Sequence, residues 1–198
     1  MTNAILIFVK NSIPGKVKTR LAATVGDDEA IRVYHKLAQH TQLVTADLKE
    51  KKMVFYSDYI VQSDIWQNEN YEKQIQVGND LGKRMCNAFQ YSFDYGNNKA
   101  VIIGTDCPGL NTSLLKKAFE ELDSADVVIG PATDGGYYLL GMKILYTELF
   151  NGIVWSTSDV RKETIKICLK LNLNYHLLEI LPDIDEEKDL VYMKDLLS

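Results

Sequence analysis

Three basic side chains follow closely after the first apolar run of the chain. Residues 10–21 read KNSIPGKVKTRL, so a Pro-Gly turn is followed by Lys16, Lys18 and Arg20 within five residues. A glycine-containing loop with several cations suits a phosphate group, because backbone N–H groups and charge-assisted hydrogen bonds converge on it. The stretch contains neither GxxxxGKS/T nor GxGxxG, and a solvated basic loop is the alternative interpretation. The candidate phosphate-binding residues here are Lys10, Gly15, Lys16, Lys18, Thr19 and Arg20.

A second stretch that combines glycine with basic residues is QIQVGNDLGKRM, residues 74–85. Asp80 is an acceptable N-cap for a helix that begins at the next residue, and this structural role is its simplest interpretation. Glycine at position 82, inside the first helical turn, costs about 1 kcal/mol relative to alanine. Accepting that cost predicts a close approach to another group, such as a nucleotide. The candidate nucleotide-binding residues of this stretch are Gly78, Asp80, Gly82 and Arg84.

Acidic residues stand in three turns of the sequence. Asp106 follows the apolar run VIIG and precedes Cys-Pro-Gly, Asp134 stands in TDGGYY, and Asp183 and Asp185 stand in PDIDEEKDL. Ligands of open α/β sheets bind at the carboxyl ends of strands, and several carboxylates gathered there would suit Mg²⁺ or Mn²⁺. We predict Asp106 and Asp185 as metal ligands. Taken singly, each aspartate could instead be a turn former or a helix cap.

The residues after Asp134 are candidates for binding an acceptor. Two glycines let the backbone come close to a ligand, and of the following tyrosine pair one ring should point inward and one toward the pocket, because strand side chains alternate. Trp155 is expected in the core or in a pocket wall. The acceptor-binding candidates are Gly135, Gly136, Tyr137 and Trp155. Cys107 could be a nucleophile, but a small buried cysteine is the simpler interpretation.

Strands and helices alternate along the chain and must position these turns. Apolar or β-branched runs predict strands at residues 4–9, 53–56, 74–77, 99–104, 126–129 and 175–178. Helical spacing of apolar residues predicts helices at 27–51, 81–93, 112–122 and 159–171. Such alternation predicts a three-layer α/β/α fold with a mostly parallel sheet. Residues 137–140 look like a strand reached without a crossover helix, which predicts an antiparallel member in a mixed sheet.

Composition excludes several classes of partner. The chain has 198 residues and a formal net charge of −5, so it has no basic excess to neutralise a nucleic acid. No apolar stretch is long enough to span a membrane, and no internal repeat or linker divides the chain, which we expect to form a single domain over residues 1–198. The three widely spaced cysteines fit a reducing cytoplasm better than a disulfide framework, and no His/Cys grouping indicates zinc.

Five motifs in this order, FVKNSIPGKVKTRL, QVGNDLGKRM, IIGTDCPGL, PATDGGYYLLG and DIDEEKDL, resemble a bacterial family of glycosyltransferase-like proteins with a GT-A fold, the fold of the nucleotide-diphospho-sugar transferases. That family is similar to phospholactate guanylyltransferase and the molybdenum-cofactor guanylyltransferases. The resemblance implies that Lys18 and Arg20 hold nucleotide phosphates and that Asp106 is the metal-binding aspartate. It places Asp134 on the acceptor side or at a second position near the metal, and Asp185 in the closing acidic motif.

This chain departs from the family pattern at three positions, which are Ser12, Asn79 and Glu186. The function expected from the resemblance is transfer of a group, most simply a sugar, from a nucleoside-diphosphate donor to a small-molecule acceptor with Mg²⁺ or Mn²⁺. Lys18 and Arg20 would stabilise the leaving phosphate, and Asp134 would orient or deprotonate the acceptor. A nucleotidyltransferase that releases pyrophosphate is the alternative, and a non-catalytic nucleotide-binding protein is a further one.

Overall fold

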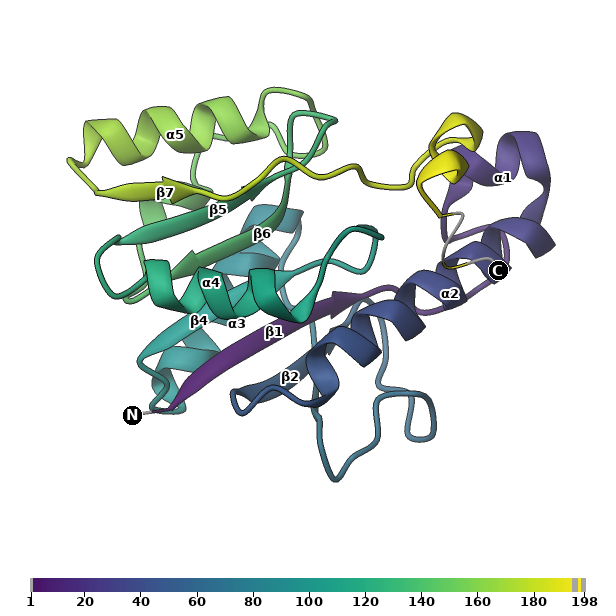
Figure 1. Cartoon of the computed structure of the whole chain (residues 1–198), viewed down its shortest axis with the longest axis horizontal. Helices are drawn as coiled ribbons and strands as arrows, with labels where there is room; N and C mark the ends of the chain where they lie inside the picture. The colour runs from purple at the N-terminus through teal and green to yellow at the C-terminus, as the bar shows by residue number, and fades with distance from the viewer. Residues whose placement is uncertain (1, 194–195, 197–198) are drawn as a thin grey trace.

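The computed structural model describes residues 2–193 and residue 196, which form a mixed sheet between helices (Figure 1). The strands are β1 (Asn3–Val9), β2 (Lys51–Tyr56), β3 (Glu72–Ile75), β4 (Lys99–Ile103), β5 (Val127–Pro131), β6 (Tyr137–Met142) and β7 (Tyr175–Leu177). The α-helices are α1 (Thr19–Val25), α2 (Asp27–Ala46), α3 (Leu81–Asp94), α4 (Thr112–Glu121) and α5 (Val160–Lys170). Two 3-10 helices, η1 (Thr147–Phe150) and η2 (Glu187–Met193), complete the described elements.

The sheet has seven strands in the order β3-β2-β1-β4-β6-β5-β7. Strand β6 runs antiparallel to both β4 and β5, and the other neighbouring strands pair in parallel. The predicted fold class, a mostly parallel mixed sheet with one antiparallel strand, is therefore confirmed. Strand β6 runs antiparallel to β5 because a tight turn joins the two strands. A parallel arrangement would need a crossover helix between them.

Both faces of the sheet are covered, which explains the uninterrupted apolar runs. Along β1, Ile5, Ile7 and Val9 belong to one apolar cluster and Ala4 and Leu6 to another on the opposite face. Helices α2 and α4 contribute to the first cluster, and α3, α5 and η1 to the second. Side chains of a strand point alternately to the two faces, so a strand covered on both sides needs apolar residues at every position.

A third apolar cluster brings the C-terminal segment back to the start of the chain. Ile184 and Met193 pack against Leu21, Val33 and Leu37 on helices α1 and α2. Figure 1 shows this segment (yellow) running from β7 across the molecule to α1. The closing motif is thereby held at the carboxyl end of β1, next to the basic loop.

The clearest differences between the sequence prediction and the structure lie in three elements. Helix α1 was not predicted, because seven residues with a single buried side chain, Leu21, give no readable helical period. Helix α2 ends at Ala46 rather than at residue 51, where β2 already begins. Strand β3 begins at Glu72 and not at residue 74, because its polar side chains hide it from an apolar pattern. In the described part of the chain no helix combines the length and hydropathy that a membrane span requires.

Candidate functional site

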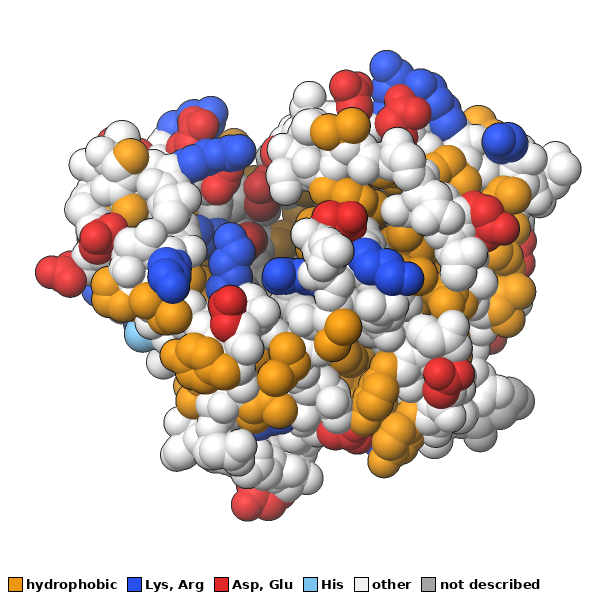
Figure 2. All heavy atoms as spheres, turned by 180° about the vertical axis from the view of Figure 1, so that it is seen from behind, with side chains coloured by type: hydrophobic (Ala, Val, Ile, Leu, Met, Phe, Trp, Pro, Cys, Tyr) orange, Lys and Arg blue, Asp and Glu red, His pale blue; other side chains and the backbone are white. Residues whose placement is uncertain are grey.

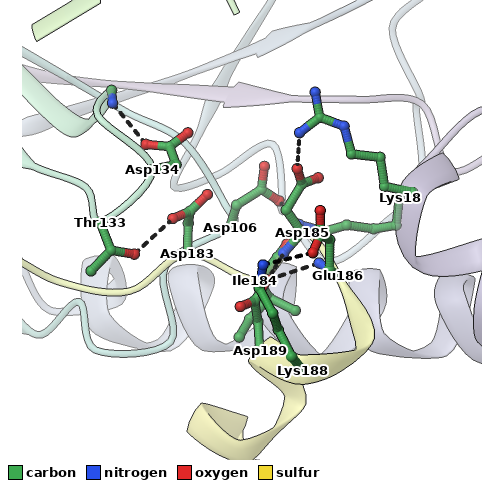
Figure 3. A network of polar contacts seen from close by, with 12 residues as sticks. Lys18, Asp106, Thr133, Asp134, Asp183, Ile184, Asp185, Glu186, Lys188 and Asp189 are labelled. Atoms are coloured by element: carbon green, nitrogen blue, oxygen red, sulfur yellow. Dashed lines mark hydrogen bonds and ion pairs between the residues drawn. The ribbon is translucent and has the colours of Figure 1, made fainter. Parts of the chain in front are cut away.

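Three segments that are distant in sequence meet at the carboxyl ends of β1 and β4. They are the basic loop before α1, the turn after β4 that carries Asp106, and the closing segment around Ile184 (Figure 3). Figure 2 shows the molecule hollowed on this side, with acidic side chains inside the hollow and Lys and Arg side chains at its rim. This is the edge of the sheet at which open α/β folds bind ligands.

Lys18 joins the three segments. Its backbone is left-handed (φ 49°), and its side chain is only 5% exposed. The Nζ atom donates to the carbonyl oxygen of Ile184 at 2.5 Å and lies 2.5 Å from Oδ1 of Asp106. The Ile184 N–H in turn donates to the Asp106 carbonyl oxygen at 2.9 Å. A buried ammonium needs such partners, because an unpaired buried charge costs several kcal/mol.

Arg20 and Asp185 form a second cation–carboxylate pair at the same place. Nη1 of Arg20 contacts Oδ2 of Asp185, and the two side chains are 65% and 40% exposed. An exposed pair of this kind contributes at most about 1 kcal/mol to stability. Arg20 can therefore leave Asp185 for another anion at small cost. Lys10 and Lys16, the other cations of the loop, are also exposed to solvent.

Asp183 lies among the other carboxylates of the site. Burial raises the pKa of the Asp183 carboxyl above its usual range, and the negative charges of Asp134, Asp106 and Asp185 raise it further. Oδ1 of Asp183 accepts a hydrogen bond from the Thr133 hydroxyl at 3.4 Å. Figure 3 shows the Asp183, Asp106 and Asp134 side chains next to one another. Like charges gathered in this way favour a bound cation, because a cation relieves their repulsion.

Asp134 sits in a turn built by the two glycines that follow it. Its Oδ1 accepts from the Gly136 N–H at 2.7 Å, which fixes the carboxylate over the turn. Gly135 has a φ of +94°, and a Cβ there would lie 2.1 Å from the Ser158 carbonyl oxygen. Glycine is thus required at this position because the segment before α5 packs against it. The N–H of Arg161, in the first turn of α5, also donates to the Gly135 carbonyl oxygen.

At the start of α3 the structure confirms the predicted N-cap, Asp80, and gives Gly82 a different neighbour from the one expected. Asp80 is the N-cap of α3, and its Oδ1 accepts from the Lys83 N–H at 2.7 Å. Gly82 is needed for a close approach, but the neighbour is Trp155 and not a nucleotide. A Cβ on Gly82 would lie 2.2 Å from the indole ring. Trp155 also stacks on Phe150, with 6.5 Å between ring centroids, so it is a packed side chain of the α3 face.

The tyrosine pair and Cys107 are structural. Tyr138 is 6% exposed, and its hydroxyl donates to the Glu179 carbonyl oxygen at 3.1 Å. The Tyr137 hydroxyl is buried on the opposite face of the sheet, beside Thr164, and burial raises its pKa. The two rings are therefore packed on opposite faces of the sheet, and that one of them lies at the substrate pocket stays a prediction. Cys107 is only 3% exposed, and burial raises the pKa of its thiol to about 12, so its surroundings favour the small buried residue over the nucleophile.

Sequence reasoning left Asp183 out of its set of site residues, although a signal for it exists. In the stretch DID an apolar residue stands between two aspartates, and alternate residues of an extended chain share a face. Asp183 and Asp185 therefore point away from the core while Ile184 between them is fully buried. No pattern in the sequence indicates that Thr133 bonds to Asp183 or that the Ile184 carbonyl oxygen accepts from Lys18.

The acidic side chains of the site could serve as ligands of a divalent cation. All the acidic groups at this place are carboxylates, which hard cations prefer. Among the described residues no three His, Cys, Asp or Glu side chains are placed to hold a metal ion together. This arrangement still fits Mg²⁺ or Mn²⁺, because such an ion is often held by one or two carboxylates and by the phosphates of its substrate.

The sheet order and the acidic and basic groups at its carboxyl edge define a GT-A-type fold, that of the nucleotide-diphospho-sugar transferases. The chain belongs to a bacterial family described as "Uncharacterized protein conserved in bacteria (DUF2064)", whose model matches residues 33–157. This confirms the family resemblance that the five motifs indicate.

Solved structures agree with this assignment. A protein of Desulfovibrio desulfuricans G20, described as a "putative nucleotide-diphospho-sugar transferase", is 35% identical with a TM-score of 0.87, and the match covers 96% of this chain and 85% of that one. The inositol-1-phosphate CTP transferase of T. maritima is 14% identical with a TM-score of 0.58, covering 99% and 95% of the two chains. The 4-diphosphocytidyl-2C-methyl-D-erythritol synthase of Anaerococcus prevotii DSM 20548 is 8% identical with a TM-score of 0.60, covering 99% and 96%. These last two show the fold alone. No curated protein matches the chain.

Proposed function

We propose that this protein is a metal-dependent transferase that takes a glycosyl group from a nucleoside-diphosphate sugar. The observation that carries the proposal is the meeting of Asp106, Asp134 and Asp183 with the basic loop at one edge of the sheet. The 35% identical protein described as a "putative nucleotide-diphospho-sugar transferase" supports the donor class. The substrate would lie in the hollow seen in Figure 2.

The basic loop would bind the diphosphate of the donor. Lys16 and Arg20 are exposed, so their charges can reach a phosphate without a change in the core. Lys18 uses two of its three N–H donors on Ile184 and Asp106. The third donor remains for a phosphate oxygen, so that Lys18 would hold Asp106 in place and also stabilise the leaving group.

Asp106 would hold Mg²⁺ or Mn²⁺ together with a second carboxylate. Asp185 is the predicted second ligand, and it would have to give up its ion pair with Arg20 to bind the metal. Asp183 is the other candidate, because it already lies beside Asp106 and Asp134. A bound divalent ion supplies charge neutralisation on the diphosphate leaving group. The backbone hydrogen bond between Ile184 and Asp106 keeps the two acidic segments together for this purpose.

Asp134 would face the acceptor. The Gly136 N–H fixes its Oδ1, while the carboxylate as a whole remains exposed. It can therefore orient an acceptor hydroxyl by accepting its hydrogen bond, or take up its proton. Gly135 and Gly136 remain predicted acceptor-binding residues through their backbone, since the space that a side chain of Gly135 would need is filled by the Ser158 carbonyl. Trp155 and the Tyr137 hydroxyl are engaged in packing.

The proposal is tested by binding and turnover. Thermal shifts would be measured with UDP-, GDP-, ADP- and dTDP-sugars and with nucleoside triphosphates, with and without Mn²⁺. We expect a metal-dependent shift with one nucleotide sugar in the wild type and its loss in Asp106→Asn. Asp94→Asn is the matched control, because Asp94 is an exposed aspartate at the end of α3.

The released product then identifies the reaction. Nucleoside diphosphate formed from the bound sugar donor would support glycosyl transfer. Pyrophosphate formed from a triphosphate would replace it with nucleotidyl transfer, and metal-dependent binding without turnover would indicate a non-catalytic nucleotide-binding protein. If no nucleotide shifts the melting temperature with or without the metal, the proposed site is wrong.

A further inference from the structure

Each of the two predicted metal ligands is paired with a cation of the basic loop. Lys18 contacts Asp106, and Arg20 contacts Asp185. Figure 3 shows both carboxylates where the basic loop meets the closing segment. The cations that would bind a diphosphate and the carboxylates that would bind a metal ion therefore neutralise one another. A diphosphate and a divalent ion must each compete for groups that are already engaged.

The pair of Lys18 and Asp106 is fixed. The Lys18 side chain is buried, and its ammonium also donates to the Ile184 carbonyl oxygen at 2.5 Å. The ammonium contacts Oδ1 of Asp106, whereas Oδ2 has no hydrogen-bond partner within the described part of the chain. Since the Asp106 side chain is half exposed, its Oδ2 can take a metal ion while Oδ1 keeps Lys18.

The pair of Arg20 and Asp185 is releasable. Both side chains are exposed, and among the residues that the structure describes neither makes a further side-chain contact. An exposed ion pair shifts an equilibrium by at most about fivefold, because solvent screens it and two long side chains must be ordered. Either partner can therefore turn to another ion.

The backbone around Asp185 is anchored on both sides. Oδ2 of Asp189 accepts from the N–H groups of Asp185 and Glu186 at 3.1 and 2.8 Å. On the other side Ile184 is fully buried, and its N–H donates to the Asp106 carbonyl oxygen at 2.9 Å. Release of Arg20 therefore needs only side-chain torsions and no movement of the closing segment.

The charge of each partner opposes the ligand of the other. The Arg20 guanidinium repels a divalent ion that approaches Asp185, and the Asp185 carboxylate repels a diphosphate that approaches Arg20. A ligand that takes one member of the pair frees the other for the opposite ion. Such a coupling is reciprocal, so the diphosphate must help the metal ion as much as the metal ion helps the diphosphate.

From these two pairs we propose that Arg20 and Asp185 form an autoinhibitory latch that couples diphosphate binding to metal binding. A diphosphate takes Arg20 and thereby releases Asp185, which joins Asp106 on the divalent ion. The pair of Lys18 and Asp106 stays closed and keeps the closing segment in place. This inference rests on the proposed function, because it describes how the same site admits its donor and its metal.

The first test uses Mn²⁺ alone, whose binding to the full chain is measured by electron paramagnetic resonance of the free ion. Arg20→Met removes the cation of the latch, and we expect Mn²⁺ to bind about two- to fivefold more tightly, the range of an exposed ion pair. Lys188→Met is the matched control, because Lys188 is an exposed cation of the closing segment that pairs with Glu186 and not with Asp185. It should change the Mn²⁺ affinity much less.

The second test removes the carboxylate of the latch. Asp185→Asn should strengthen the binding of pyrophosphate without metal about two- to fivefold, measured by titration calorimetry in EDTA. Glu186→Gln is the control, since it removes a neighbouring carboxylate that is paired with Lys188. On the Asp185→Asn background, Arg20→Met should no longer strengthen Mn²⁺ binding, because no pair is left to open. Circular dichroism establishes that each variant is folded.

These probes separate the latch from the proposed function. Mn²⁺ and pyrophosphate report on the ion pair whatever the reaction is, whereas turnover of a nucleotide sugar reports on the function. Equal Mn²⁺ affinities in wild type and folded Arg20→Met would overturn the latch and leave the function standing. Equal gains in Arg20→Met and Lys188→Met would also overturn it, because they would reflect net charge alone. The expected gains without any turnover would keep the latch and remove the function.

Discussion

At the scale of single residues, Gly82 and Trp155 illustrate how a costly glycine is explained by its neighbour. The first turn of α3 accepts a poor helix former because the indole of Trp155 occupies the place where a side chain would be. The same ring stacks on Phe150, which limits its freedom to move aside. The sequence could reveal that something approaches position 82, but not which group does so.

The variant Gly82→Ala measures this contact. Alanine gains about 1 kcal/mol of helix propensity over glycine. Overpacking costs about 1–3 kcal/mol, and the clash with Trp155 should place the cost near the upper end of that range. We therefore expect a net loss of up to about 2 kcal/mol in the free energy of unfolding. Urea denaturation of the single variants and of Gly82→Ala with Trp155→Leu completes a double-mutant cycle. In the Trp155→Leu background alanine should become neutral or stabilising; an equal loss in both backgrounds would contradict the packing account.

At the scale of elements, edge strand β3 is held by polar contacts more than by apolar ones. Oε2 of Glu72 lies 2.7 Å from Lys51 Nζ, and its Oε1 accepts from the Tyr91 hydroxyl at 2.7 Å. The Lys51 ammonium also lies 3.2 Å from the centroid of the Tyr95 ring. These contacts tie β3 to β2 and α3, and they explain why an apolar pattern places the strand two residues too late.

Glu72→Gln should show a pH-dependent loss of stability. Burial pushes the pKa of Glu72 up, but the hydrogen bonds from Lys51, Tyr91 and Gln74 outweigh it and leave the pKa below its ordinary value. A carboxyl whose pKa is depressed in the folded state stabilises above its unfolded pKa and loses that contribution as the pH falls through the folded value.

We therefore expect Glu72→Gln to cost about 1 kcal/mol at pH 7, since the group is partly exposed, and progressively less below about pH 4. Urea denaturation at pH 7, 5 and 3.5 gives the difference at each pH. Glu69→Gln, an exposed neighbour on the preceding loop, serves as the control. A cost that does not change with pH would mean that the charge of Glu72 contributes nothing.

At the scale of the whole molecule, the site depends on the return of the C-terminal segment to the first strand. Apolar contacts of Ile184 and Met193 with α1 and α2 seat the segment, and the Lys18 ammonium joins it to the turn of Asp106 (Figure 1). The carboxylates on either side of Ile184 reach the site only through this seating. The Lys18 side chain therefore contributes both to the stability of the fold and to the assembly of the site.

Lys18→Met keeps the length of that side chain and removes its charge. We expect a loss of about 1–3 kcal/mol in the free energy of unfolding, the cost of hydrogen bonds to a charged group. Amide hydrogen exchange should rise in residues 181–189 and stay unchanged in β1 and β4. Lys16→Met, an exposed lysine of the same loop, should change neither quantity. Faster exchange throughout the sheet in Lys18→Met would show that Lys18 supports the core and not the closing segment.

The sequence by itself determined those features that depend on neighbouring residues. The fully apolar runs predicted strands covered on both faces, and Asp80 marked the start of α3. The absence of a crossover helix before residue 137 indicated the antiparallel strand. Each follows from local sterics, hydrogen bonding and burial pattern, which a few consecutive residues record. The turns that carry Asp106, Asp134 and Asp185 were also placed correctly, because Pro and Gly mark them.

Only the tertiary structure decided which of these residues meet. Lys18 lies 166 residues from Ile184, and no local pattern records that its ammonium is buried against the closing segment and Asp106. The same holds for Asp183 among the carboxylates and for Trp155 on Gly82. Such contacts are set by how whole elements pack, so their partners are fixed by the fold and not by spacing along the chain.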